Sequence, residues 1–159
     1  MNEICYDATN EDDTDLLGTA LAETLPAGTT VALSGTLGAG KTYLVKAIAV
    51  ALGVEPEQVI SPTFVLCREY AAKHPIYHLD AYRIRDDDEF LELGPEEYFD
   101  SDGITFVEWA DKVSDCLPPD HVEIDIEPLA ATSRRFRIRA AGPRSSAVVA
   151  TLRVRLAGC

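Results

Sequence analysis

The hydrophobic positions of the amino-terminal part follow two helical patterns separated by a short apolar run. Five apolar residues recur at helical spacing in the first pattern: Leu16, Leu17, Ala20, Leu21 and Leu25. They predict a helix that Asp12 or Asp13 caps and that ends before Pro26. The second pattern predicts a helix from about residue 41 to residue 52, ending at Gly53.

Short apolar runs between turn residues predict the strands. Residues 31–33, 76–79 and 104–107 have the length of buried strands, and one or two helices are expected between residues 86 and 99. Two further segments, 121–127 and 134–139, alternate polar and apolar side chains, as half-exposed antiparallel strands do. The order predicts an α/β fold: a mixed sheet with flanking helices and additional antiparallel strands.

Size and composition suit one domain. The chain has 159 residues, of which 47% are hydrophobic, so a single domain over residues 1–159 can bury a core. It has neither a charged and then apolar amino-terminal stretch nor an apolar run of about 18 residues. We therefore expect a soluble, cytoplasmic protein.

Charge is distributed unevenly along the chain. The formal net charge of −13 argues against broad attraction to nucleic-acid phosphates. All 27 acidic residues precede residue 130, whereas the last thirty residues carry seven arginines: Arg134, Arg135, Arg137, Arg139, Arg144, Arg153 and Arg155. We favour the interpretation that these arginines alternate along edge strands and pair with the acidic surface, over contact with nucleotide phosphate or RNA. Residues 142–159 form a basic tail for which a strand, a disordered extension and an added contact surface stay open.

Residues 35–42 read Gly-Thr-Leu-Gly-Ala-Gly-Lys-Thr, a complete match to G-x-x-x-x-G-K-[ST]. The motif follows a strand pattern and precedes a helical one, which is the context of a P-loop. Its glycines let backbone N–H groups surround a phosphate chain, and the helix start adds its positive dipole end. Lys41 is expected at the β- and γ-phosphates, and Thr42 is expected to place its hydroxyl on Mg²⁺. A ligand-free glycine turn would need neither side chain.

Hydrolysis by a P-loop protein usually needs a second acid at a strand end. Asp80 and Glu108 each follow a predicted strand, so both could lie at the carboxyl edge of the sheet, and periodicity does not choose between them.

Two further features lie close to these motifs. Pro62 restricts the chain before Thr63, whose hydroxyl could reach the γ-phosphate or its metal. Trp109 is the only tryptophan, and the sequence leaves open whether it packs in the core or beside a ligand.

Together, these residues carry a family resemblance. Leu-Gly-Ala-Gly-Lys-Thr at 37–42, Ser-Pro-Thr-Phe at 61–64, His-Leu-Asp-Ala-Tyr-Arg at 78–83 and Glu-Trp at 108–109 closely resemble the TsaE family of bacterial P-loop ATPases, over about residues 5–130. The resemblance implies a protein that binds the TsaB–TsaD complex. Its ATP hydrolysis would support threonylcarbamoyl modification of adenosine beside the anticodon, without touching the adenosine itself.

The resemblance also implies roles for individual residues. It places ATP against Thr14, Gly38, Ala39, Gly40, Lys41, Thr42, Tyr43, Thr63 and Trp109, with Mg²⁺ on Thr42 and Glu108. Asp80 would position or deprotonate the attacking water, and residues 61–64 would sense the γ-phosphate. An arginine around position 134 would approach the nucleotide. Tyr43 departs from the family, which commonly has a smaller residue there.

Two other functions compete with an ATPase. A small-molecule kinase would need an acceptor pocket and a lid arginine, for which Arg83 and Arg85 are candidates, although Asp86, Asp87 and Asp88 follow them directly. A binding module that uses ATP only to order its surface is the other. A GTPase is disfavoured because the chain has no Asn-Lys-x-Asp motif.

Overall fold

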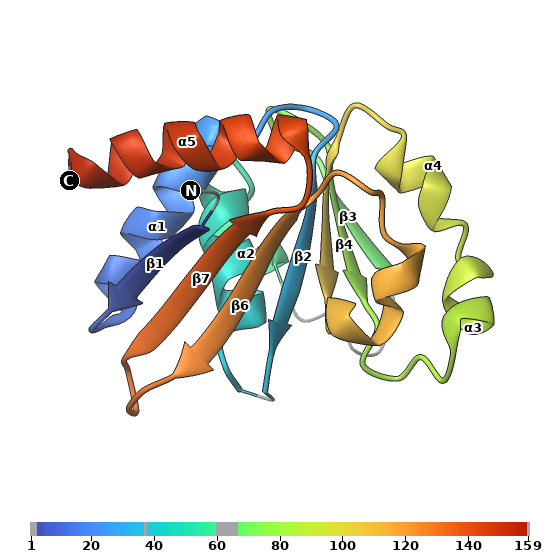
Figure 1. Ribbon diagram of the computed structural model, residues 1–159, viewed down its shortest axis with the longest axis horizontal. Helices are drawn as coiled ribbons and strands as arrows, with labels where there is room; N and C mark the ends of the chain where they lie inside the picture. Colours follow the sequence, from blue (N-terminus) through green and yellow to red (C-terminus); the bar gives the residue numbers. More distant parts are fainter. Residues whose placement is uncertain (1–2, 37, 60–66, 159) are drawn as a thin grey trace.

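The computed structural model describes residues 3–36, 38–59 and 67–158 (Figure 1). Its strands are β1 (Glu3–Ala8), β2 (Thr30–Gly35), β3 (Cys67–Tyr70), β4 (Ile76–Asp80), β5 (Ile104–Glu108), β6 (Val122–Pro128) and β7 (Arg134–Ala140). Its α-helices are α1 (Glu11–Thr24), α2 (Lys41–Ala51), α3 (Asp87–Leu91), α4 (Pro95–Phe99) and α5 (Pro143–Ala157), and its 3₁₀ segments include η1 (Pro56–Gln58) and η3 (Ala110–Cys116).

All seven strands form one sheet in the order β1-β7-β6-β2-β5-β4-β3. The central strands β6, β2, β5 and β4 run parallel to one another, while β1, β7 and β3 add antiparallel pairs at the two sides. The predicted α/β fold with a mixed sheet is therefore confirmed. The carboxyl ends of β2, β4 and β5 meet at one edge, the lower edge in Figure 1, where α/β sheets bind ligands.

Two apolar clusters cover different parts of the sheet. Helices α1, α2 and α5 bury residues such as Leu21, Ile48 and Leu152 against one face. A smaller cluster on the other face includes Phe90 and Val113 and covers the part made by β2, β5, β4 and the start of β3. Close packing of α1 on α2 depends on Gly18, because a Cβ there would lie 2.5 Å from the Ala47 Cβ.

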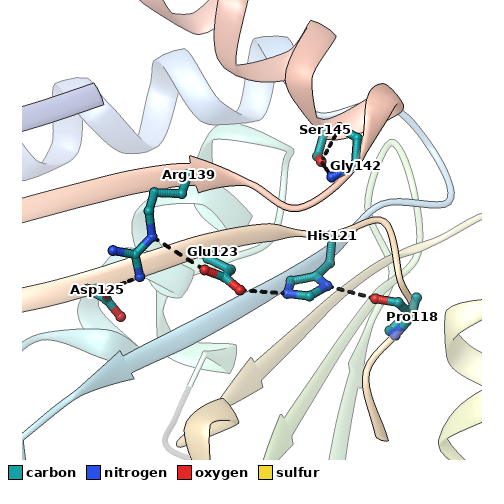
Figure 2. Close-up of polar contacts among 7 residues, drawn as sticks. All are labelled: Pro118, His121, Glu123, Asp125, Arg139, Gly142 and Ser145. Atoms are coloured by element: carbon teal, nitrogen blue, oxygen red, sulfur yellow. Dashed lines mark hydrogen bonds and ion pairs between the residues drawn. The ribbon is translucent and has the colours of Figure 1, made fainter. Parts of the chain in front are cut away.

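The other face of β1, β7 and β6 carries alternating charges instead. Cross-strand neighbours place an arginine of β7 between residues of β1 and β6 on each of three rungs, at Arg135, Arg137 and Arg139. We call these three arginines and their acidic neighbours the charge ladder. Figure 2 shows one rung, in which Arg139 contacts Glu123 and Asp125.

Ion pairs satisfy the other two rungs of the charge ladder as well. Arg135 Nε lies 2.8 Å from Asp7 Oδ1, and Arg137 lies 3.9 Å from Glu127. The arginine–acid pairing favoured from the sequence is confirmed for these three arginines and for Arg155, which pairs with Glu23. It is not borne out for Arg134, which donates to backbone carbonyl oxygens. The edge placement is wrong for β7, because β1 pairs along its outer side.

Other differences from the sequence predictions concern the chain's ends. Asn10 caps α1 by accepting a hydrogen bond from Asp13 N, so neither Asp12 nor Asp13 is the cap, and Leu16 is 52% exposed. Strand β1 was not predicted. Residues 143–157 form helix α5, a form absent from the alternatives considered for the tail.

Asp120 accepts hydrogen bonds from N–H groups in the first turn of helix α5. Asp120 Oδ2 and Oδ1 accept hydrogen bonds from Arg144 N (2.7 Å) and Ser145 N (3.0 Å). The helix then buries Val149 and Leu152 in the larger core. Within the described ranges, no helix combines the length and apolar character that crossing a membrane requires.

Candidate functional site

The P-loop connects the central strand β2 to the start of α2. Gly35 has a φ of +155°, and a Cβ on it would lie only 2.7 Å from the Ile126 carbonyl oxygen, so a larger residue would displace the loop from β6. Gly40, with φ 108°, is the N-cap of α2 and supplies no side-chain hydrogen bond. The first turn of α2 contains no acidic residue, which leaves its N–H groups available to an anion.

Lys41 folds back onto the loop that precedes it. Its Nζ donates to the carbonyl oxygens of Gly35 (2.7 Å) and Thr36 (2.9 Å), and the residue is only 4% exposed. Burial lowers the pKa of Lys41, an effect opposed by the nearby carboxylates of Glu108, Asp111 and Asp80. A phosphate in the loop would offer this cation charged oxygens in place of the two carbonyls.

Thr42 contacts Glu108 at the carboxyl end of β5. The Thr42 hydroxyl donates to Glu108 Oε2 at 2.8 Å, and Glu108 is 4% exposed. His78 Nε2 contacts the same carboxylate oxygen. Thr42 and Glu108 are therefore the pair that could hold Mg²⁺ beside the P-loop.

Asp80 is the register partner of Glu108 on the neighbouring strand but has a different environment. It is 2% exposed, and its Oδ1 accepts a hydrogen bond from Tyr82 N at 2.7 Å. The sequence left the two acids equivalent as candidates for the metal. The hydrogen bond from the Thr42 hydroxyl favours Glu108 as the metal ligand, and Asp80 lies next to Glu108 on the neighbouring strand.

In the part of the chain that the structure describes, no group of three or more His, Cys, Asp or Glu side chains is arranged to hold a metal ion. The Thr42 hydroxyl and the Glu108 carboxylate nevertheless suit Mg²⁺ in a nucleotide site. Mg²⁺ commonly takes only one or two protein ligands and completes its shell with water and phosphate oxygens. A hydroxyl and a carboxylate at the start of the P-loop helix fit that requirement.

Trp109 packs in the smaller apolar cluster and also borders Lys41. Its ring packs against the smaller apolar cluster and lies 4.9 Å from the Tyr82 ring, while Lys41 Nζ lies 3.9 Å from its centroid. Its backbone has φ 60°, a left-handed conformation that costs energy for a bulky residue. The strand end at Glu108 and the turn at Trp109 together direct the indole toward Lys41.

A cavity of about 310 Å³ opens beside the P-loop, between α1 and the β6–β7 hairpin. Thr14, Gly38, Gly40 and Tyr43 line it, so the structure brings these predicted nucleotide-binding residues together. The Tyr43 hydroxyl turns away to Asp15 Oδ1 at 3.1 Å, and burial together with this hydrogen bond raises the pKa of Tyr43.

Arg134 also lines this cavity and ties the hairpin to the P-loop. Its Nε donates to the Ala39 carbonyl oxygen (2.8 Å) and its Nη1 to the Ala130 carbonyl oxygen (2.9 Å). Arg134 is therefore the candidate for the arginine predicted to approach the nucleotide, and its side chain points in a different direction from those of the charge ladder.

Thr63 and the proposed switch residues 61–64 lie outside the described residues. His78 was quoted within a motif but given no role. The available signal was its period-two spacing from Asp80, which puts both side chains on one face of β4.

Comparisons with known proteins place the chain in one family. A family model described as threonylcarbamoyl adenosine biosynthesis protein TsaE matches residues 8–136. The tRNA threonylcarbamoyladenosine biosynthesis protein TsaE of Treponema pallidum is 36% identical over 126 residues, covering 79% of this chain and 93% of the relative. The protein of the same name from Bacillus subtilis is 34% identical over 145 residues, covering 91% of this chain and 90% of the relative.

A solved structure extends the similarity to three dimensions. The crystal structure of Bacillus subtilis YdiB matches with a TM-score of 0.80 and 29% sequence identity, covering 96% of this chain and 95% of that one. The family model spans most of the chain, and both relatives are more than 30% identical to it. The chain belongs to the TsaE family of threonylcarbamoyl adenosine biosynthesis proteins.

Proposed function

We propose that this protein is a Mg²⁺-dependent ATPase that acts with the TsaB–TsaD complex in the threonylcarbamoyl modification of adenosine in tRNA. The observation that carries the proposal is that Lys41 and Thr42 begin α2 and that the Thr42 hydroxyl donates to Glu108 at the end of β5. Lys41 offers a cation to phosphate, and the Thr42 and Glu108 oxygens offer two ligands to Mg²⁺ beside the same helix start.

Each side chain has a role that its position supports. The backbone from Gly38 to Tyr43 cradles the phosphates, and Lys41 opposes the charge on the transferred phosphoryl group. Thr42 and Glu108 hold Mg²⁺, which neutralises phosphate charge when it is bound. Asp80, buried beside Glu108, orients the attacking water or takes its proton.

The surrounding residues complete the nucleotide site. Thr14 and Tyr43 border the cavity next to the loop, Arg134 holds the loop against the β6–β7 hairpin, and Trp109 lies against Lys41. Thr63 stays a predicted γ-phosphate contact.

Hydrolysis by the isolated protein is expected to be slow. Lys41 is held by two carbonyl oxygens and must leave them to reach a phosphate. Many P-loop switches gain rate when a partner orders a loop or supplies a cation. We therefore propose that the TsaB–TsaD complex accelerates turnover. The similarity to proteins named for tRNA threonylcarbamoyladenosine biosynthesis supports this choice of partner pathway.

The test is phosphate release from Mg-ATP by the protein alone, by purified TsaB and TsaD, and by all three together. Lys41→Ala provides the background for contaminating activity. A Lys41-dependent rise on mixing supports the proposal. A phosphorylated small molecule instead of free phosphate would indicate a kinase, and nucleotide binding without either product would indicate a binding module.

A further inference from the structure

His78 is a fully buried polar residue at the centre of the parallel sheet. It lies on β4, where its register partner on β5 is Phe106, and its relative exposure is 0%. Because side chains alternate along a strand, Glu108 projects from the same face two residues beyond Phe106. His78 is therefore the diagonal neighbour of Glu108, one layer deeper in the sheet than the acid.

The imidazole makes one polar contact. Nε2 meets Glu108 Oε2, while Nδ1 is buried and finds no hydrogen-bond partner among the described residues. A carboxylate oxygen accepts, so Nε2 carries a hydrogen, and Nδ1 is the nitrogen left without a partner among the described residues. Burying such a group without a second partner is unfavourable compared with an apolar side chain. The position thus has a polar residue where packing alone would favour Leu or Phe.

The contact acts on the oxygen that also receives Thr42. Glu108 Oε2 accepts from the Thr42 hydroxyl at 2.8 Å and from His78 Nε2. Two donors that come from α2 and β4 fix the rotation of a carboxylate that its flexible side chain would otherwise leave free. With its proton directed at Glu108, the Thr42 hydroxyl keeps its lone pairs for a cation.

We propose that His78 is a positioning residue that holds the Glu108 carboxylate against Thr42 and so preorganises the Mg²⁺ site. The proposal rests on the function proposed above for Thr42 and Glu108. Outer residues that orient a metal ligand commonly change metal affinity by about 10- to 100-fold. His78 does not touch nucleotide or metal in this role; it acts through Glu108.

Three substitutions separate positioning from packing. In His78→Gln the amide nitrogen reaches about as far as Nε2, so the donor to Glu108 is kept. In His78→Asn the amide reaches only about as far as Nδ1, so the donor is lost with a similar polar group retained. His78→Leu removes both nitrogens and suits an apolar neighbourhood.

The measurement is the affinity for the non-hydrolysable analogue AMP-PNP by titration calorimetry, in Mg²⁺ and in EDTA, together with the thermal midpoint of each variant. We expect His78→Leu and His78→Asn to lose about tenfold or more of the tightening that Mg²⁺ gives, with EDTA affinities within about twofold of wild type. His78→Gln should recover most of that tightening. If His78→Leu does not fold, the Gln and Asn variants still decide the matter.

A double substitution provides an independent check. If His78 acts through Glu108, His78→Leu should add little further loss of Mg²⁺ tightening in a Glu108→Gln background. Full additivity would overturn the proposal.

Three other results would also overturn it: unchanged Mg²⁺ tightening in His78→Leu, equal losses in Mg²⁺ and EDTA, or a His78→Gln variant no better than His78→Asn. Wild-type protein that binds AMP-PNP equally well with and without Mg²⁺ would contradict the metal site itself, and the role of His78 with it.

Discussion

The carboxyl edge of the parallel strands and the charge ladder both concentrate charged side chains, but they treat charge in opposite ways. At the edge, Lys41, Asp80 and Glu108 are at most 4% exposed. Lys41 Nζ is held by carbonyl oxygens, and the Glu108 carboxylate by a hydroxyl and an imidazole. On the ladder, side chains such as Arg137 and Glu127 are about half exposed, and each arginine has an acidic partner across a strand.

The difference separates function from surface chemistry. Exposed ion pairs contribute about 0–1 kcal/mol each, and their loss is easily tolerated. Buried charged groups are costly to maintain, so they mark sites where a ligand is expected to bind. Arg134 and Arg135 show the boundary, since adjacent residues of one strand face the P-loop and the ladder respectively.

The largest effect is expected at Lys41. Lys41→Ala should lower Mg-ATP hydrolysis by about a hundredfold or more, because the cation opposes charge on the transferred phosphoryl group. Steady-state phosphate release checks this, with circular dichroism to establish that the variant folds. Near wild-type turnover of Lys41→Ala would contradict the functional role assigned to the carboxyl edge as opposed to the charge ladder.

The two edge acids should differ from each other in kind. Glu108→Gln is expected to weaken Mg²⁺-dependent nucleotide binding and to lower turnover by about a hundredfold. Asp80→Asn should lower turnover with nucleotide affinity nearly unchanged, because its proposed role concerns water. Binding and rate measured on both variants test the assignment, and an exchange of the two phenotypes would reverse it.

An intermediate effect is expected at the boundary between the regions. Arg134→Ala should weaken nucleotide binding by about tenfold or more, since a hydrogen bond to a charged group contributes about 1.5–3 kcal/mol and about 1.4 kcal/mol corresponds to tenfold. Arg135→Ala is the matched control, one residue away on the opposite face. Equal affinities for the two variants would place Arg134 with the ladder arginines.

Helix capping by Asp120 should give a smaller, pH-dependent effect. Burial raises the pKa of Asp120, but hydrogen bonds from Ser145 and Arg144 outweigh it and hold the pKa below its usual 3.8. The stabilisation is therefore present above pH 3.8 and lost as pH falls through the lowered value. Asp120→Ala should reduce the free energy of unfolding by about 1 kcal/mol at pH 7 and by less near pH 3. Urea unfolding at both values checks it; a constant difference would refute the capping role.

The smallest effect is expected on the ladder itself. Arg137→Gln removes an exposed pair with Glu127, whose atoms lie 3.9 Å apart. The free energy of unfolding should change by no more than about 0.5 kcal/mol, and nucleotide affinity should not change. A tenfold loss of affinity in calorimetric titration would show that this face takes part in the site.

The sequence predicted what depends on neighbouring residues and missed what depends on distant pairing. The P-loop between β2 and α2 follows from one contiguous motif, and strands β4 and β5 follow from short apolar runs. Strand β1 was missed because its six residues gain their partner only from β7, more than a hundred positions later. The contact between His78 and Glu108 likewise needs the register of two strands.

Helix α5 shows a different reason for failure. Val148, Val149 and Leu152 have helical spacing, but arginines interrupt the apolar pattern, and a Gly-Pro start is a turn signal as well as a helix start. The stabilising partners, Asp120 and the core face of β7, lie outside the segment. Tertiary contacts therefore decided a structure that local composition left open.

The most direct test of the account is a crystal structure of the protein with Mg²⁺ and a non-hydrolysable ATP analogue. We expect the triphosphate along residues 38–43, Lys41 Nζ moved from the Gly35 and Thr36 carbonyl oxygens to the phosphates, and the metal beside Thr42 and Glu108. A nucleotide bound elsewhere, or bound in the loop while Lys41 stays on those carbonyls and Glu108 stands away from the metal, would contradict it.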